Sequence, residues 1–480
     1  MIDPSLIQKL KTLPRESGES DYRLLFRHFQ RLILQGHLTG GSRLPASRAL
    51  AAELKIARNT VKTAYEILIA EGFVETRVGA GSYVVDLSDK LLQKEVDSVD
   101  PKRPAPIHLT DYAKQLLALP KLNPTNSLQL QPGVPLLQEF PLNQWKRSLN
   151  QATVNSSLNA SPPAGEVRLR EQIRHLLLHT RGIEVTSEQI LITSGSQQAA
   201  FMVAQLLTNV GETVLVETPG FPGTSGVLKA AGCQIKTVDL YKQGALPDGR
   251  MINITPSRNF PLGHTLPLER RLEVIHWAET HNSWILEDDY DSEFAAGRPV
   301  SALFAISKTE RVIYTGTFSR TMFPGLRLGY LVLPQTLVPL FTQARRLFDG
   351  TLSVPAQIAT AIFIERGYYS RHLKRMREFY KQRQEEILQF ISESPLAELP
   401  LLSDEGGMHI VLGLPQKIPD HELVSRLAEA GLGIRALSSY ALGHKELNGL
   451  VIGCNYRNRP DLKRAFALLR SCFDSFSLSD

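Results

Sequence analysis

The chain has 480 residues, 42% of them hydrophobic and 21% charged, which predicts a globular protein of two or more domains and excludes a fibrous or disordered chain. Its net charge is +6, and neither a signal-peptide core nor the roughly 18 consecutive apolar residues of a membrane span occur, so we expect a cytoplasmic protein. The three cysteines, Cys233, Cys454 and Cys472, lie far apart, which argues against a disulfide framework or a zinc module.

Residues 21–86 are predicted to form a small domain of their own. Apolar residues recur at helical spacing from Tyr22 to Gln35, and glycines then end this first helix. A second helix begins near Ser47, whose hydroxyl can cap it, and a third occupies residues 58–71. Two short strands around the glycines of residues 79–81 complete the domain, which we therefore interpret as a winged helix-turn-helix.

The motifs of this domain are similar to those of the winged-helix head of the GntR superfamily. They are found at Gly41–Arg48, at Arg58–Val61 and in the glycine-rich wing. A departure is Ala57, where many members have a serine that caps the third helix. The resemblance and the outward polar residues of the third helix imply a set of DNA-contacting residues: Arg43, Ser47, Arg48, Arg58, Asn59, Thr60, Lys62, Arg77, Gly79 and Gly81.

Charge alone does not decide whether this domain binds DNA. Between Asp21 and Val85 there are nine Lys or Arg residues against five Asp or Glu residues, a net charge of about +4. This modest basic bias is compatible with a polyanionic partner, but a winged helix that contacts only proteins, with its arginines solvated, remains an alternative.

Residues 87–125 mix charged residues with prolines, which is typical of a semi-extended linker. The remainder, residues 126–480, alternates helical patterns with short runs that are apolar almost throughout. Strands of that composition are buried on both faces, so the pattern predicts a largely parallel sheet covered by helices. The runs are Gln189–Thr193, Thr213–Glu217, Met251–Thr255, Trp284–Glu287, Val312–Phe318 and Leu328–Leu333.

Polar clusters follow several of these runs, at the strand ends where open α/β sheets bind ligands. Thr193–Gln198 follows a strand and opens a helix, so its amides and hydroxyls could hold a phosphate. The other clusters are Thr255–Gly263, the acidic run Glu287–Phe294, and Ser319–Arg327. No GxGxxG motif follows a strand, which disfavours a dinucleotide-binding fold.

The body resembles fold-type I pyridoxal-phosphate proteins, and the whole chain resembles the MocR/GabR-like regulators, which join a GntR head to an aminotransferase-like domain. The motifs that carry the resemblance are Glu217–Gly223, Glu287–Phe294, Gly316–Ser319 and Pro324–Tyr330. The resemblance implies an α/β protein with an N-terminal winged helix and a fold-type I body. It further implies a homodimeric transcriptional regulator that reads paired half-sites of double-stranded promoter DNA and senses a small-molecule effector.

The resemblance also implies a site for pyridoxal 5'-phosphate. Asp288 would pair with the pyridine nitrogen, Tyr290 would bind the ring hydroxyl, and Asn259 would lie near the ring oxygen. Phe221 would stack on the ring. The residues implied around the phosphate are Ser194, Gly195, Ser196, Ser319 and Arg327.

The chain departs from the family pattern at Arg320, which stands where an aminotransferase carries its Schiff-base lysine. A guanidinium remains protonated in proteins and cannot attack an aldehyde as a neutral amine. We therefore expect no aminotransferase activity, and expect that pyridoxal phosphate could bind only without a covalent bond, or as an amine form or amino-acid adduct. Arg320 is then itself a predicted cofactor-binding residue, since it could add a charge-assisted contact to the phosphate or to an effector carboxylate. Arg258 and Asn259 are a second departure, because a His-Gln pair is more usual there.

Other interpretations remain open. The body could bind no pyridoxal phosphate and act as a scaffold or sense another metabolite, and an active aminotransferase is a further alternative. Arg435 and Arg457 are displaced candidates for the arginine that grips a substrate carboxylate. His175 and His179 stand four residues apart on a helix, a spacing that can bind a metal, but they have no nearby third ligand. We expect no metal site.

Overall fold

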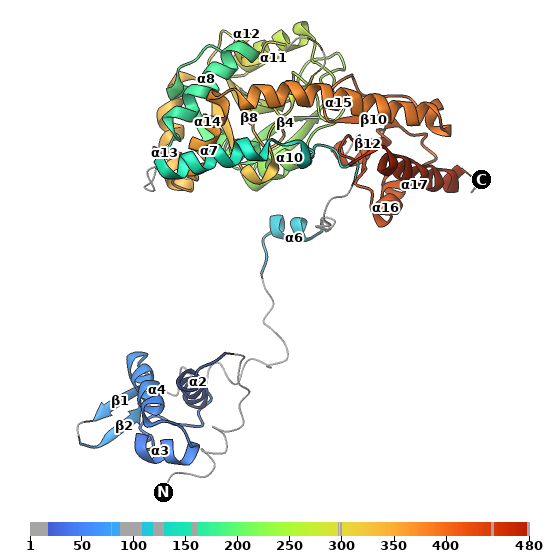
Figure 1. Ribbon diagram of the computed structural model, residues 1–480. Coiled ribbons are helices and arrows are strands. Elements are labelled where there is room, and N and C mark those ends of the chain that lie inside the picture. Colours follow the sequence, from blue (N-terminus) through green and yellow to red (C-terminus); the bar gives the residue numbers. More distant parts are fainter. Residues whose placement is uncertain are drawn as a thin grey trace. The chain divides into compact units, whose positions relative to one another are not determined.

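A computed structural model divides the chain into two compact units, Met1–Lys114 and Gln115–Asp480. The first unit is blue in Figure 1 and the second runs from cyan to red. Each unit is described here by itself. The structure describes residues 18–77, 79–86, 108–118, 129–155, 161–295, 297, 300–442 and 446–477.

The first unit contains the expected helices and hairpin around one apolar core. The core is formed by residues from all three helices and both strands, and the Phe29 and Tyr65 rings meet edge to face at 5.5 Å. The Tyr65 hydroxyl also donates to the carbonyl of Pro45, 2.9 Å away. The elements are α2 (Asp21–Leu34), α3 (Ser47–Leu54), α4 (Arg58–Ala70), β1 (Val74–Arg77) and β2 (Gly81–Val84).

The segment that leads into α3 is bonded to the hairpin. β1 and β2 pair antiparallel, and the backbone of Gly41–Leu44 continues the sheet alongside β2. The Gly41 and Leu44 amides donate to the carbonyls of Val84 and Ser82, each over 2.8 Å, and the Val84 amide donates to Ser42 over 2.9 Å. The start of α3 and the wing are therefore held together by backbone hydrogen bonds.

The expected cap of α3 by Ser47 is wrong. Ser47 is already the first residue of the helix, and the N-cap is Ala46, whose side chain makes no cap hydrogen bond. A capping hydroxyl must come from the residue with extended backbone that precedes the first turn, and that residue is Ala46. The N-cap of α4 is Ala57, which likewise provides no oxygen. Both helices thus begin without a side-chain cap.

The second unit is built on a seven-stranded sheet with the order β3-β9-β8-β7-β6-β4-β5. β9 runs antiparallel to its neighbours β3 and β8, whereas all other pairs are parallel. The strands are β3 (Ile190–Thr193), β4 (Thr213–Glu217), β5 (Gln234–Val238), β6 (Met251–Ile254), β7 (Trp284–Asp289), β8 (Val312–Thr317) and β9 (Gly329–Val332).

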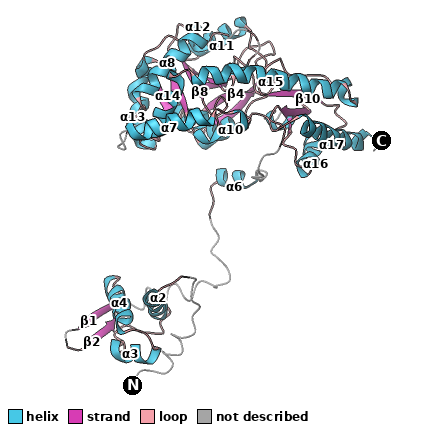
Figure 2. Cartoon of the chain, viewed as in Figure 1, coloured by secondary structure: helices cyan, strands magenta, loops and turns pink. Residues whose placement is uncertain are grey.

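Helices cover both faces of this sheet, as Figure 2 shows with helices in cyan around magenta strands. Alternate side chains of one strand serve opposite faces. Val214 and Val216 of β4 pack with α9, whereas Leu215 packs with α11. The helices of this region are α7 (Leu142–Asn155), α8 (Val167–Arg181), α9 (Ser196–Leu207), α10 (Pro222–Ala230), α11 (Leu268–Thr280), α12 (Leu303–Ile306), α13 (Val338–Phe348), α14 (Val354–Glu365) and α15 (Tyr368–Ser392). α6 (Asp111–Ala118) precedes them and spans the boundary between the two units.

A smaller antiparallel sheet follows near the C-terminus, with the order β10-β12-β11. It consists of β10 (His409–Gly413), β11 (Arg435–Ala436) and β12 (Gly449–Gly453), and it packs with α16 (Asp420–Glu429) and α17 (Arg459–Ser477). The short 3-10 turns are η1 (Leu137–Glu139), η2 (Ser187–Gln189), η3 (Ser292–Phe294), η4 (Pro324–Leu326), η5 (Gln335–Leu337), η6 (Pro395–Glu398) and η7 (Leu437–Tyr440). Within the described part of the chain, no helix is both long and apolar enough to cross a membrane.

A serine at position 57 should stabilise the first unit. Ala57 has the extended backbone of an N-cap, so the hydroxyl of an Ala57→Ser variant could accept a hydrogen bond from an amide in the first turn of α4. We expect a gain of about 1 kcal/mol, seen as amide hydrogen exchange in α4 that is slower by about fivefold. Ala57→Val, which adds atoms but no acceptor, serves as the control and should give no such protection. Equal protection in both variants would contradict the capping argument.

Candidate functional site

A cavity of about 120 Å³ lies where β7 and β8 end and α9 begins. Residues predicted from the cofactor resemblance line much of it: Gly195, Ser196, Phe221, Asp288, Tyr290, Ser319, Arg320 and Arg327. Four further lining residues were not predicted: Gln197, Thr255, Phe260 and Thr317. All four lie within the strand-end clusters and motifs of the sequence, at Thr193–Gln198, Thr255–Gly263 and Gly316–Ser319, but they were not singled out as binding residues.

Two predicted residues do not line this cavity. The backbone amide of Ser194 donates to the Gln198 side chain over 2.7 Å, so this amide is already satisfied. Asn259 is fully buried, and its side-chain amide donates to the carbonyl of Pro219 over 3.1 Å. The Asn259 Oδ1 atom has no hydrogen-bond partner.

One end of the cavity combines a helix N-terminus with an arginine. α9 begins at Ser196, directly after Gly195, whose φ of +117° favours glycine. A Cβ atom at Gly195 would lie 3.7 Å from the nearest nitrogen of the Arg327 guanidinium, so this arginine lies against the backbone that opens the helix. Backbone amides at a helix start and a guanidinium both attract anions, and together they suit a phosphate group.

Asp288 provides an unpaired acid on the cavity wall. It is buried, and its Oδ1 atom has no hydrogen-bond partner. Burial raises the pKa of Asp288 to about 7, the neighbouring Asp289 carboxylate raises it as well, and the Arg320 charge lowers it. Buried polar atoms are normally satisfied, so an orphaned carboxyl oxygen facing a cavity fits a ligand that carries an N–H donor.

The two acids that flank Asp288 are, by contrast, well satisfied. Asp289 forms an ion pair with Arg181 over 2.9 Å and accepts from the Tyr314 hydroxyl over 2.7 Å. Glu287 accepts from the backbone amides of residues 303 and 304, each over 2.8 Å. Because side chains alternate along β7, the satisfied acids face away from the side on which Asp288 lies.

Aromatic rings form another part of the cavity wall. Phe221 is 37% exposed, and its ring meets Phe260 edge to face at 5.9 Å. Phe260 in turn meets the Tyr290 ring at 5.3 Å. The Tyr290 hydroxyl donates weakly to the backbone carbonyl of Asn259, over 3.5 Å, and burial raises the pKa of Tyr290 well above its usual value. Tyr290 therefore stays a neutral donor.

Arg258 serves the fold and does not line the cavity. It is buried and donates to the carbonyls of Glu405 and Gly406 over 3.1 and 2.6 Å. Its Nε atom lies 3.5 Å from Asp291 Oδ1. These contacts join the turn after β6 to the turn before β10, and so join the large sheet to the small one. Arg435 and Arg457 also lie outside the cavity lining.

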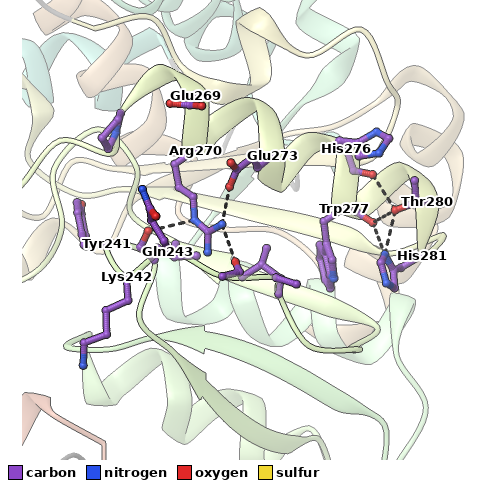
Figure 3. A pocket seen from close by; sticks show the side chains of 15 residues that line it. Tyr241, Lys242, Gln243, Glu269, Arg270, Glu273, His276, Trp277, Thr280 and His281 are labelled. Carbon is purple, nitrogen blue, oxygen red and sulfur yellow. Dashed lines mark hydrogen bonds and ion pairs between the residues drawn. The ribbon is translucent and has the colours of Figure 1, made fainter.

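A larger cavity, of about 860 Å³, lies between α11 and the turn that follows β5 (Figure 3). Its central arginine, Arg270, donates to the carbonyls of Leu240 and Gly244 over 3.1 and 2.9 Å and pairs with Glu273 over 2.5 Å. Among its described lining residues, none has a buried side-chain polar atom without a partner. The polar groups here are used by the fold, so the smaller cavity is the stronger candidate site.

In the first unit, the predicted DNA-contacting residues differ in their exposure to solvent. Most are exposed: Arg43, Arg48, Arg58, Asn59, Lys62, Arg77, Gly79 and Gly81. Ser47 and Thr60 are half-buried. Arg77 pairs with Glu75 over 2.7 Å, and its guanidinium lies 4.6 Å from the centre of the Tyr83 ring. The start of α4 therefore presents Arg58 and Asn59 to solvent, and the wing holds its arginine in place.

Two family profiles match the chain in succession. The profile of the bacterial regulatory proteins of the gntR family matches residues 22–84. The profile of the aminotransferase class I and II family matches residues 125–447, which is more than half of the chain.

Curated proteins with the same two-part organisation are similar over most of their length. The probable rhizopine catabolism regulatory protein MocR of Rhizobium meliloti is 31% identical, covering 96% of this chain and 95% of that protein. The HTH-type pyridoxine biosynthesis transcriptional regulator PdxR of Corynebacterium glutamicum is 30% identical, covering 92% and 94%. The HTH-type transcriptional regulator TauR of Rhodobacter capsulatus is 30% identical, covering 83% and 85%.

Solved structures with the fold of the second unit are aminotransferases. The kynurenine aminotransferase of Pyrococcus horikoshii is 23% identical with a TM-score of 0.67, covering 78% of this chain and 96% of that one. LysN, the alpha-aminoadipate aminotransferase of Thermus thermophilus, is 22% identical with a TM-score of 0.66, covering 77% and 95%. At these identities the likeness shows the fold, and it confirms the predicted fold-type I body. The chain belongs to the family of MocR-type transcriptional regulators, in which a GntR winged helix-turn-helix, a DNA-binding type of domain, is joined to a class I and II aminotransferase domain.

Proposed function

We propose that this chain is a transcriptional regulator whose body senses a small molecule and carries out no transamination. The observation that carries the proposal is Arg320, which lines the cavity beside Asp288 and Arg327. It stands where aminotransferases of this fold have the lysine that binds the cofactor covalently. No lysine is among the described residues that line the cavity, and a guanidinium is a poor base for the proton abstraction that transamination needs.

The cavity residues fit pyridoxal 5'-phosphate as a ligand held by contacts alone. Asp288 would receive the pyridine N–H on its orphaned oxygen, and Arg327 with Ser196 would hold the phosphate. Tyr290 would donate to the ring oxygen, and Phe221 would cover the ring. When bound, this cofactor supplies an electron-withdrawing ring, and in a sensor its role is that of a ligand or of part of an amino-acid adduct.

A second candidate is a regulator whose body senses a molecule other than pyridoxal phosphate. The observation that favours it is the cavity volume of about 120 Å³. Typical ligand pockets have about 300–1,000 Å³. The proposed cofactor would therefore require movement of a lining side chain, whereas a smaller anion would not.

For the chain as a whole, we propose a head at residues 21–86, a linker at residues 87–125 and an effector-binding, dimerising body at residues 126–480. Two heads in one dimer would read paired half-sites on double-stranded promoter DNA. Such a regulator would act in the compartment that holds the DNA, and it would need no membrane and no metal. Among the described residues, no group of three or more acids, histidines or cysteines is placed to hold a metal ion.

Specific DNA binding should depend on Arg58. Its exposed position at the start of α4 suits contact with a base edge, so Arg58→Ala should weaken binding by about 1–3 kcal/mol if it reads a base. The measurement is a gel shift with a DNA fragment selected by the wild-type protein from a random-sequence pool. Arg31→Ala removes an equal charge from the exposed end of α2, outside the predicted set, and should change binding little. The proposal is abandoned if joint alanine substitution of Arg43, Arg48 and Arg58 leaves the shift unchanged.

Covalent attachment of pyridoxal phosphate should be absent in the wild type and gained in Arg320→Lys. A buried lysine amine can lose its proton and bond to the aldehyde, which a guanidinium cannot do. We expect the lysine variant, mixed with the cofactor, to show a visible absorbance band, and borohydride followed by peptide mass analysis to place the label at position 320. Arg320→Gln is the matched control without an amine. Label on another lysine of the wild type would show that the anchor has moved, and the absence of a band in the lysine variant would favour the second candidate.

The protein should be a homodimer. Phe221 on the cavity wall is 37% exposed and could be covered by a second copy of the body, and a winged head gains affinity when two copies bind neighbouring half-sites. We expect light scattering at micromolar concentration to give about twice the chain mass of 53.5 kDa. A mass of one chain under these conditions would contradict the dimer.

A further inference from the structure

Arg320 holds a backbone carbonyl of a segment far away in the sequence. It lies in the turn that follows β8, and its Nη1 donates a hydrogen bond to the carbonyl oxygen of Gly133. Gly133 has a φ of +69°, and a Cβ atom built there would overlap the Arg320 guanidinium. The close approach therefore requires a residue without a side chain at position 133.

The segment that Arg320 holds begins the described part of the body, at residues 129–133. On its other side it is fastened to the small C-terminal sheet. The Gly453 amide of β12 donates to the carbonyl of Leu130 over 2.8 Å, and the Gly433 amide, just before β11, donates to Gln129 over 2.7 Å. Leu130 itself is fully buried. The segment thus lies between the small sheet and the wall of the cavity, and in sequence it follows the proposed linker.

The present acceptor of Arg320 is a neutral carbonyl, which is a weaker partner than an anion. A carboxylate adds the attraction of opposite charges to the hydrogen bond, and it can accept two parallel N–H bonds from one guanidinium, which a single carbonyl oxygen cannot do in the same geometry. In the described part of the chain, no ion pair joins Arg320 to an acid. Its positive charge nevertheless acts on the site, since it lowers the pKa of both Asp288 and Asp291 against the effect of burial.

Two arginines of different surroundings line the same cavity. Arg327 lies against the start of α9, where backbone amides could also bind an anion, so it suits a phosphate. Arg320 approaches the cavity from the turn after β8, and its hydrogen bond goes to the Gly133 carbonyl. A ligand that satisfies both arginines carries two anionic groups, a phosphate for Arg327 and a second anion for Arg320. A planar guanidinium accepts a carboxylate well as that second anion.

We propose that the effector of this site carries a carboxylate that takes Arg320 away from the Gly133 carbonyl, and so frees the segment by which the linker enters the body. This inference rests on the proposed sensing function and adds a ligand class, a phosphorylated compound with a carboxylate, of which phosphopyridoxyl amino acids are members. It also accounts for the small cavity, because the Arg320 side chain moves when such a ligand enters. Arg320 then has one of two acceptors at a time, the chain's own carbonyl or the ligand.

The ligand class is tested by two probes that differ in the carboxylate. N-(5'-phosphopyridoxyl)glycine has both anions, whereas pyridoxamine 5'-phosphate has the phosphate alone. Calorimetry with the full chain should show the glycine adduct binding more tightly than pyridoxamine 5'-phosphate by about tenfold or more. Arg320→Gln keeps a polar side chain, shorter than arginine and without charge, and it should lose this preference while its affinity for pyridoxamine 5'-phosphate changes little.

Each outcome of this comparison has a definite meaning. If Arg320→Gln lowers the affinity for both probes equally, Arg320 binds the phosphate, and the assignment of the carboxylate to Arg320 is overturned. If the wild type binds both probes with the same affinity, the inference fails while a pyridoxal-type sensor remains supported. If the wild type binds neither probe, the pyridoxal form of the proposed function fails together with the inference.

Release of the segment is tested separately by amide hydrogen exchange on the full chain. In the wild type, the glycine adduct should speed exchange in the peptide that covers residues 129–135 by about two- to tenfold, the range expected for loss of one hydrogen bond. Pyridoxamine 5'-phosphate should not do so. Arg320→Gln should show the faster exchange without any ligand, while the peptide that covers β4 should be unchanged and serves as the folding control. Unchanged exchange around Gly133 in the adduct-bound wild type overturns the release step.

Discussion

The buried ion pair between Arg181 and Asp289 is the interaction on which the candidate site depends. β7 ends in three successive acids, and burial of a charged carboxylate is unfavourable unless it is paired and hydrogen-bonded. Arg181 comes from the end of α8 and lies 2.9 Å from Asp289, and the Tyr314 and Ser292 hydroxyls supply two further hydrogen bonds. With Asp289 held in this way, its neighbour Asp288 is free to face the cavity on the opposite side of the strand. Arg181 therefore offsets much of the cost of burying Asp289, whereas Glu287 is satisfied by the backbone amides of residues 303 and 304.

A second buried arginine ties this site to the rest of the body. Arg258 lies directly beside Asn259 in the sequence, yet its guanidinium contacts the carbonyls of Glu405 and Gly406 and the carboxylate of Asp291. The Gln384 side chain of α15 binds the same turn, accepting from the Gly406 amide over 3.2 Å and donating to its carbonyl over 2.8 Å. The turn that leads into the small sheet is thus fixed to the end of β7. Through these contacts, one turn connects Asp291 with α15.

The elements that could be predicted from the sequence are those with a distinct pattern of apolar residues within a short segment. Six strands of the large sheet were predicted because each is apolar on both faces. β5 was missed because this edge strand alternates exposed and buried residues, and the small sheet was not predicted as a separate element. The cap of α3 was placed one residue too late, since the sequence pattern does not reveal which residue first adopts helical backbone angles.

For the site, the motifs indicated most of the residues that line the cavity, because residues at the ends of neighbouring strands come together in any sheet of this kind. The motifs did not indicate which of these polar groups are already hydrogen-bonded to other parts of the protein. Asn259 donates to Pro219, and the Ser194 amide is satisfied by Gln198, so neither contact was foreseeable from spacing. The bond from Arg320 to Gly133 joins residues 187 positions apart, and only the folded chain brings them together.

The backbone hydrogen bonds between Gly41–Leu44 and β2 limit how far the predicted DNA-contacting parts of the first unit can move relative to one another. The entry to α3 is bridged to β2 of the wing, and α4 packs with both strands in the same core, so movement of α4 relative to the wing would disturb this core. If the start of α4 and the wing both contact DNA, as we propose, the distance between these two contacts would therefore vary little. Variation in the distance between two half-sites would have to be absorbed outside the heads, by the chain that joins each head to its body.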